Sequence, residues 1–286
     1  MSAAIKKLKT AIELERIQYL NKLLLEEMPQ YKADAATFPD KTHAQRQLLR
    51  SLMNLRHPGP ISSDFLREQD ILLQEESSAK GVVKLDELPT IADETSKDIT
   101  PQDAPAHNLV LWQGDITRLA TDGIVNAANS AMLGCFAPCH GCIDNAIHSA
   151  AGLQLREACA QLMKQQGHPE PAGQAKITPA YNLPSKFVLH TVGPIIPSDC
   201  QPNEAEAELL ASCYQSCLKL ASQHYLKSIA FCCISTGEFH YPRKEAAEIA
   251  LNAVSKWLAS SGSEMKVIFN VFKDEDLEVY RKLLKF

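Results

Sequence analysis

The second half of the chain alternates short apolar runs with longer segments in which apolar residues recur at helical spacing. The apolar runs, which are typical of strands buried on both faces, lie at 109–112, 124–125, 175–178, 187–190, 229–234 and 267–271. The segments with helical spacing lie near 144–165, 204–224, 243–260 and 274–284. Strands that alternate with helices favour a mainly parallel sheet with helices on both faces. We therefore expect a three-layer α/β fold over residues 107–286.

The first 75 residues have a purely helical pattern. Apolar side chains recur there at roughly helical spacing, among them Ile5, Leu8, Ile12, Leu48 and Leu52. We expect a helical N-terminal region over 1–75 that packs on or covers the main domain, or that docks a partner protein. Residues 76–106 are more polar and lose this periodicity, which predicts a connecting segment that is partly flexible.

Polar loops follow three of the predicted strands directly. They carry Asp115 and Ile116 after the first strand, Asn126 and Asn129 at the second, and the run Ser235, Thr236, Gly237, Glu238 and Phe239. In sheets of this kind ligands bind beyond the carboxyl ends of the strands, so these loops are candidate ligand loops. Backbone N–H groups of the third loop can cradle a phosphate, and carboxamides suit vicinal hydroxyls. Ordinary turns and helix caps are the alternative interpretation.

A loop with three cysteines and a histidine follows the second strand. Cys135, His140 and Cys142 offer two thiolates and an imidazole, a donor set that favours zinc and leaves a fourth position for catalysis. If Cys139 also binds, the site is closed and structural. Cys139 is the immediate neighbour of His140, so joint binding is awkward and we expect the three-ligand set. A loop without metal is the remaining alternative.

Asp144 lies two residues beyond this loop, at the expected start of a helix. Its carboxylate can orient a water, receive a proton or cap the helix. His148 is four residues further on and lies on the same face of that helix. A packed or hydrogen-bonded histidine is the favoured interpretation of His148.

Composition excludes several classes of protein. The net charge of −5 comes with no strongly basic segment, which argues against a nucleic acid duplex as the main partner. No apolar run reaches the roughly 20 residues that cross a membrane, and the N-terminus has no apolar signal core. Nine unevenly spaced cysteines fit a reducing compartment, so we expect a cytoplasmic protein.

Four ordered motifs resemble the macrodomain family over about residues 107–285. They are Gly114-Asp115-Ile116-Thr117, Ile124-Val125-Asn126-Ala127-Ala128-Asn129, the segment 143–152, and Ile234-Ser235-Thr236-Gly237. Hydrolytic macrodomains of this type carry a glycine-rich stretch where this chain has Cys135 to Cys142. In this stretch the chain resembles the zinc-containing microbial macrodomains, which also carry a helical N-terminal extension.

The resemblance implies a three-layer α/β/α fold with a mixed, mainly parallel sheet, and a hydrolase that removes mono-ADP-ribose from modified proteins. Asp115 and Ile116 would contact the adenine end of ADP-ribose. The loop from Ser235 to Phe239 would hold the diphosphate and pack near the distal ribose, which Asn126 and Asn129 would face. Asp144 takes the position of the family's catalytic aspartate.

The expected reaction is zinc-dependent release of ADP-ribose from a side-chain ester. Zinc would activate a water or act as a Lewis acid at the scissile linkage, with Asp144 or Glu238 as base and Asn129 beside the ribose. The alternatives are an ADP-ribose reader with structural zinc, a hydrolase of O-acetyl-ADP-ribose, and an unrelated zinc-stabilised scaffold.

Overall fold

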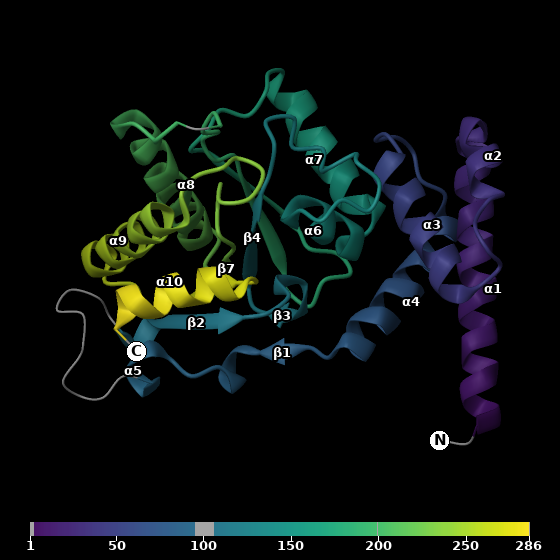
Figure 1. Ribbon diagram of the computed structural model, residues 1–286, viewed down its shortest axis with the longest axis horizontal. Helices are drawn as coiled ribbons and strands as arrows, with labels where there is room; N and C mark the ends of the chain where they lie inside the picture. The colour runs from purple at the N-terminus through teal and green to yellow at the C-terminus, as the bar shows by residue number, and fades with distance from the viewer. Residues whose placement is uncertain (1–2, 95–105, 199, 286) are drawn as a thin grey trace.

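The computed structural model describes residues 3–94, 106–198 and 200–285 and shows a sheet between two layers of helices (Figure 1). Among the described residues, the large sheet has the strand order β2-β8-β7-β4-β6-β5. Its strands are β2 (Leu109–Gln113), β4 (Gly123–Ala127), β5 (Ala175–Pro179), β6 (Phe187–Thr191), β7 (Ser228–Phe231) and β8 (Lys266–Val271). Neighbouring strands are parallel except β5, which runs antiparallel to β6. The predicted mixed, mainly parallel sheet is confirmed.

Helices cover both faces of this sheet. One face carries α8 (Glu204–Gln223), α9 (Arg243–Ser261) and α10 (Asp274–Leu284), and the other carries α6 (Ile143–Ala151) and α7 (Leu153–Gln166) (Figure 1). The helical stretch predicted near 144–165 is confirmed, and Gly152, which adopts φ 97°, divides it into α6 and α7. A backbone with positive φ interrupts a right-handed helix and suits glycine. The predicted strand at 229–234 is shorter than expected and ends at Phe231.

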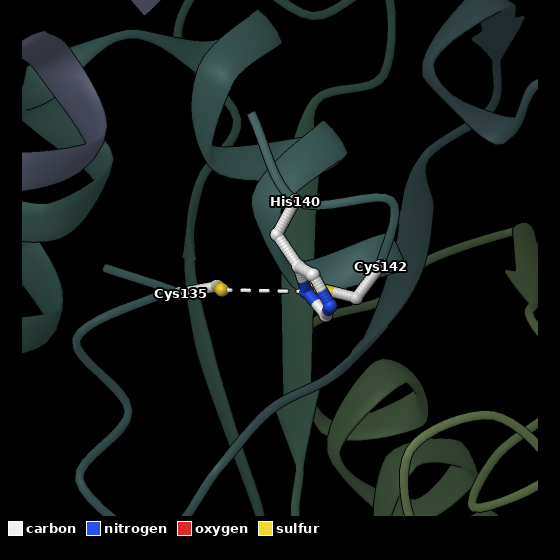
Figure 2. Close-up of side chains that lie close together, drawn as sticks. All are labelled: Cys135, His140 and Cys142. Atoms are coloured by element: carbon white, nitrogen blue, oxygen red, sulfur yellow. Dashed lines mark hydrogen bonds between the residues drawn. The ribbon is translucent and has the colours of Figure 1, made fainter. Parts of the chain in front are cut away.

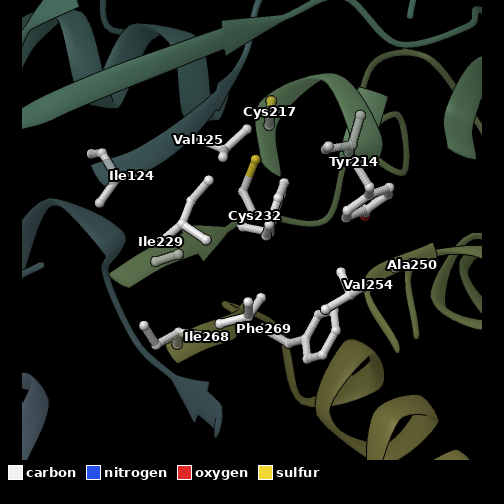
Figure 3. Close-up of a cluster of buried hydrophobic side chains, with 14 of the residues drawn as sticks. Ile124, Val125, Tyr214, Cys217, Ile229, Cys232, Ala250, Val254, Ile268 and Phe269 are labelled. Carbon is white, nitrogen blue, oxygen red and sulfur yellow. The ribbon is translucent and has the colours of Figure 1, made fainter. Parts of the chain in front are cut away.

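The main core fills the space between the sheet and its helices (Figure 3). Ile124, Ile229 and Ile268 are fully buried on three adjacent strands, and Tyr214 of α8 packs against Phe231 with ring centroids 4.9 Å apart. These strands are mostly apolar because both of their faces are covered. The core therefore gives the loops beyond the strands a rigid base.

The N-terminal region forms its own apolar cluster. Its elements are α1 (Ala3–Glu27), η1 (Pro29–Tyr31), α2 (Lys32–Ala35), α3 (Thr42–Leu55) and α4 (Ser63–Lys80). Buried side chains such as Leu24, Leu52 and Phe65 hold these helices together, and Leu153 of α7 joins them. The helical prediction is confirmed, while docking of a partner protein stays a prediction. Across the described part of the chain, no helix combines the length and apolarity that crossing a bilayer requires.

The segment predicted as a flexible connection is largely ordered where the structure describes it. Helix α4 continues to Lys80, and β1 (Val83–Lys84) pairs in parallel with β3 (Leu119–Ala120). The short η2 (Leu85–Glu87) and α5 (Ile91–Glu94) follow, and Ile91 is fully buried in the main core. This corrects the prediction for 76–94, because apolar residues there pack on the sheet domain. Residues 95–105 lie outside the described residues, and η3 (Ala106–Asn108) leads into β2.

Candidate active site

The predicted ligand loops meet at one edge of the sheet. Strands β2, β8, β7 and β4 run parallel, so their carboxyl ends and the loops that follow lie side by side. These loops hold Asp115, Asn129 and the segment 235–239, which are far apart in the sequence. Phe272 follows β8 at the same edge and is 72% exposed. Phe272 was not predicted from the sequence, although an aromatic residue directly after a buried strand can mark a ligand loop.

Asp115 and Ile116 form the turn that leaves β2. Asp115 is the N-cap of η4 (Ile116–Arg118), and its Oδ1 accepts hydrogen bonds from the Thr117 N–H at 3.0 Å and the Thr117 hydroxyl at 2.6 Å. Ile116 is buried. The cap fixes the conformation of this loop, whereas contact with adenine stays a prediction.

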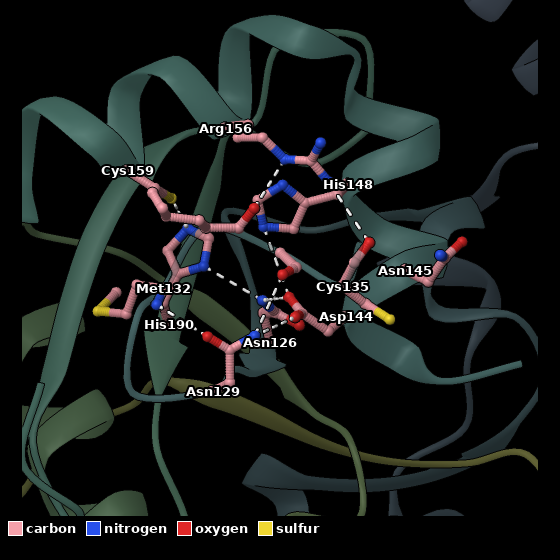
Figure 4. Close-up of polar contacts among 12 residues, drawn as sticks. Asn126, Asn129, Met132, Cys135, Asp144, Asn145, His148, Arg156, Cys159 and His190 are labelled. Atoms are coloured by element: carbon pink, nitrogen blue, oxygen red, sulfur yellow. Dashed lines mark hydrogen bonds and ion pairs between the residues drawn. The ribbon is translucent and has the colours of Figure 1, made fainter. Parts of the chain in front are cut away.

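Two asparagines hold the carboxylate of Asp144 (Figure 4). Asn126 Nδ2 donates to Asp144 Oδ1 at 2.8 Å, and Asn129 Nδ2 lies 3.4 Å from Asp144 Oδ2. Burial raises the pKa of Asp144 to about 6, and the hydrogen bond from Asn126 opposes that rise. Cys142, not Asp144, is the N-cap of α6. The two carboxamides therefore orient a buried carboxyl group.

Asn129 also shapes the start of the cysteine loop. Its Oδ1 accepts the N–H groups of Ala131 and Met132, each at 3.1 Å, and its Nδ2 donates to the Gly134 carbonyl at 3.1 Å. These bonds close the turn, as the alternative interpretation from sequence proposed. Asn129 thus links that turn to Asp144, and its contact with a ribose stays a prediction.

His148 belongs to a buried group beneath Asp144. Its Nε2 lies 3.5 Å from Asp144 Oδ1, and burial holds the pKa of His148 well below its ordinary value. The donor atoms of His148, Cys159 and His190 lie within 4.8 Å of one another, so this group could hold a metal ion. His190 Nε2 already lies 2.9 Å from the Thr178 hydroxyl. Because all three side chains are buried, a substrate does not reach them.

Cys135, His140 and Cys142 come together as the sequence predicts (Figure 2). Their donor atoms lie within 4.8 Å of one another, and Cys135 Sγ is 3.6 Å from His140 Nδ1. All three side chains are partly exposed. Two thiol groups and an imidazole match the ligands that zinc prefers, and the group is accessible from solvent. These residues therefore fit a zinc ion.

Cys139 turns away from this group. Its backbone adopts φ 53°, and its Sγ lies 3.3 Å from the Ser51 hydroxyl and 3.6 Å from the Gln47 carbonyl on α3. Its N–H donates to Asn54 Oδ1 at 2.9 Å. Cys139 is not among the donors that lie together, so the described residues provide a three-ligand group.

The loop after β7 lies beside His140. Glu238 Oε1 is 3.7 Å from His140 Nε2, too long for a hydrogen bond but close enough to favour one orientation of the ring. The N–H groups of Gly237, Glu238 and Phe239 make no hydrogen bond with any residue that the structure describes. Such groups suit an anion.

Gly193 shapes the same loop, because a Cβ at this position would overlap Ser235 Oγ and lie 3.0 Å from Ile234 Cγ2. We expect Gly193→Ala to lower the free energy of unfolding by about 1–3 kcal/mol, since the packed neighbours must move. Ser235 adopts φ 64°, which suits glycine, so the added change Ser235→Gly removes the clash. Urea unfolding of both variants checks this: a double variant no more stable than Gly193→Ala would contradict the steric cause.

Comparison with known proteins supports this description. The family model named Macro domain matches residues 125–250. A protein-ADP-ribose hydrolase of Treponema medium is 50% identical over 270 residues, covering 94% of this chain and 98% of that protein. A protein-ADP-ribose hydrolase of Staphylococcus aureus is 45% identical over 249 residues, 87% of this chain and 88% of that protein. The Trypanosoma brucei macrodomain in complex with ADP-ribose is 30% identical with a TM-score of 0.62, covering 82% of this chain and 94% of that one.

Proposed function

We propose, since the chain belongs to the macrodomain family, that it is a protein-ADP-ribose hydrolase that depends on zinc and acts on mono-ADP-ribose in ester linkage. The single observation that carries zinc dependence is the group of Cys135, His140 and Cys142 without Cys139. Three protein ligands are typical of catalytic zinc, whereas four are typical of structural zinc. The relatives named above support the hydrolase activity.

Each loop has a proposed role in binding ADP-ribose. Asp115 and Ile116 contact the adenine end, and Phe272 offers an exposed ring beside them. The N–H groups of 237–239 bind the diphosphate as hydrogen-bond donors. Asn126 and Asn129 act at the distal ribose mainly by fixing Asp144, because their carboxamides point to that carboxylate.

Asp144 and Glu238 have different proposed roles. Asp144 Oδ2 accepts a proton or a hydrogen bond from the reacting hydroxyl group, since it is the more weakly bonded carboxylate oxygen. Glu238 orients the ring of His140, as carboxylates commonly do for histidine ligands, and is the alternative base. Zinc held by the three ligands would supply Lewis-acid activation at the scissile linkage.

A single-turnover assay on a mono-ADP-ribosylated protein tests this function. We expect rapid release of ADP-ribose by the purified chain, loss of release after treatment with a chelator, and recovery when zinc is added back. Substrates modified on glutamate and on arginine distinguish the linkages, and we expect release from glutamate alone. Binding of ADP-ribose without release would show a reader module, and release only from O-acetyl-ADP-ribose would show a small-molecule esterase.

A further inference from the structure

We propose that helix α3 of the N-terminal region keeps Cys139 out of the ligand set of the metal site. This inference rests on the zinc-dependent function proposed above. It assigns positioning roles to Asn54 and Ser51. These two residues of the N-terminal region make no hydrogen bond with Cys135, His140 or Cys142. The N-terminal region then contributes to the chemistry of the active site from a position outside the sheet domain.

The hydrogen bonds that Cys139 makes with described residues are all with α3. Asn54 Oδ1 accepts the Cys139 N–H at 2.9 Å, and the Ser51 hydroxyl lies 3.3 Å from the Cys139 thiol. The Gln47 carbonyl is the third neighbour, 3.6 Å from the sulfur. These three residues lie one turn apart along a single helix face, at positions 47, 51 and 54. That face therefore receives both the backbone and the side chain of Cys139.

The conformation of Cys139 needs this support. A left-handed conformation is unfavourable for a residue with a side chain, and Cys139 has φ 53°. Rotation of φ back to negative values would redirect the thiol, which is three residues from Cys142 and one from His140. A third thiolate on the metal would close the site. The hydrogen bond to Asn54 fixes the peptide group on one side of this torsion and the contact with Ser51 holds the thiol, so together they oppose that rotation.

Helix α3 is held in place by contacts that do not involve Cys139. Arg50 Nη2 donates to Asn145 Oδ1 at 2.7 Å, and Asn54 Nδ2 donates to the Ser149 hydroxyl at 3.1 Å. Both partners are buried on α6, the helix that begins directly after Cys142. Arg156 of α7 donates to the carbonyl of Asn54 at 2.8 Å. The helix is thus fixed on α6 and α7, next to the loop that carries the proposed metal ligands.

Cobalt substitution in the full chain counts the thiolates on the metal independently of activity. For wild type and for Cys139→Ala we expect the charge-transfer absorption of two thiolates, together with equal single-turnover rates on the zinc-loaded proteins. For Ser51→Ala with Asn54→Ala we expect a third thiolate and a rate about 10–100-fold lower, the range typical of lost support for a metal ligand set. Adding Cys139→Ala to that double variant should restore two thiolates and most of the rate.

Further variants distinguish a positioning effect of α3 on Cys139 from a general effect on the stability of the fold. Asn54→Asp keeps the acceptor for the Cys139 N–H, so it should keep two thiolates. Ser51→Ala alone, at a partly exposed position, replaces the double variant if the latter does not fold, and it should show a partial gain of thiolate absorption. An unchanged spectrum in the folded variants would overturn the inference, as would loss of absorption in Cys139→Ala alone. Hydrolysis by wild type without metal would instead overturn the proposed zinc dependence, while the cobalt spectra still report on Cys139.

Discussion

Replacement of Cys135 by alanine is expected to lower the single-turnover release of ADP-ribose by at least about 100-fold. Loss of a residue that hydrogen-bonds to a metal ligand already reduces activity by about 10–100-fold. Cys135 is a direct ligand in the proposed site, so its loss should cost more. Its Sγ lies 3.6 Å from His140 Nδ1, so its loss leaves an incomplete ligand set. Rapid-quench assays on the zinc-loaded variant measure the rate, and calorimetry measures the affinity for ADP-ribose. We expect weaker but detectable binding, because the proposed contacts with the adenine end come from Asp115 and Ile116 on another loop.

Cys139→Ala is the matched control for this variant. It removes a thiol from the same loop, but the thiol of Cys139 contacts Ser51 and Gln47 rather than the three ligands. Full activity of correctly folded Cys135→Ala would exclude catalysis through this site. Equal losses in both variants would show that disruption of the loop, rather than loss of a ligand, lowers the rate.

Arg156→Met is expected to lower the free energy of unfolding by about 3 kcal/mol or more, because several buried carbonyl groups lose their donor and each unsatisfied buried acceptor costs about 1–3 kcal/mol. The guanidinium of Arg156 is buried and donates to five carbonyl groups, those of Met53, Asn54, Arg56, Leu133 and Cys135. It also lies over the Phe136 ring, 4.3 Å from its centroid. Methionine keeps most of the volume but leaves these acceptors without their donor. Urea unfolding measures the change, and we expect reduced zinc affinity because Cys135 loses its backbone support.

Arg67→Met is the control for Arg156→Met. The side chain of Arg67 is 61% exposed and pairs with Asp64 on the surface of α4, so its loss should change stability by less than about 0.5 kcal/mol. If the free energy of unfolding of Arg156→Met were lower by less than about 1 kcal/mol, water molecules would have replaced the guanidinium as donors to these carbonyl groups. Arg156 would then contribute little to holding the N-terminal region on α7.

The sequence predicts the sheet domain well because burial imposes a regular pattern there. Strands such as β4 and β8 are mostly apolar because helices cover both of their faces, and α9 repeats its alanines at helical spacing. The break at Gly152 was missed because one glycine inside a helical pattern does not show the sign of its φ angle. The ordered part of 76–94 was missed for a similar reason: β1 pairs with only two residues of β3, too few to give a periodic pattern.

The candidate metal ligands were predictable because they are local. Cys135, His140 and Cys142 lie within one loop, and their chemistry is unusual enough to mark them. The support of that loop was not predictable. Asn54 and Arg156 are ordinary polar residues of helical segments, and their bonds to the loop join positions 85 and 21 residues apart. Only the packing of α3 and α7 against the loop brings them there.

The most direct test of the account is a crystal structure of the chain with ADP-ribose, with anomalous diffraction at the zinc edge. The account predicts one zinc ion on Cys135, His140 and Cys142, beside the distal ribose, with the thiol of Cys139 still on α3. An ion bound also by Cys139, or one held instead by the buried His148, Cys159 and His190, would contradict it.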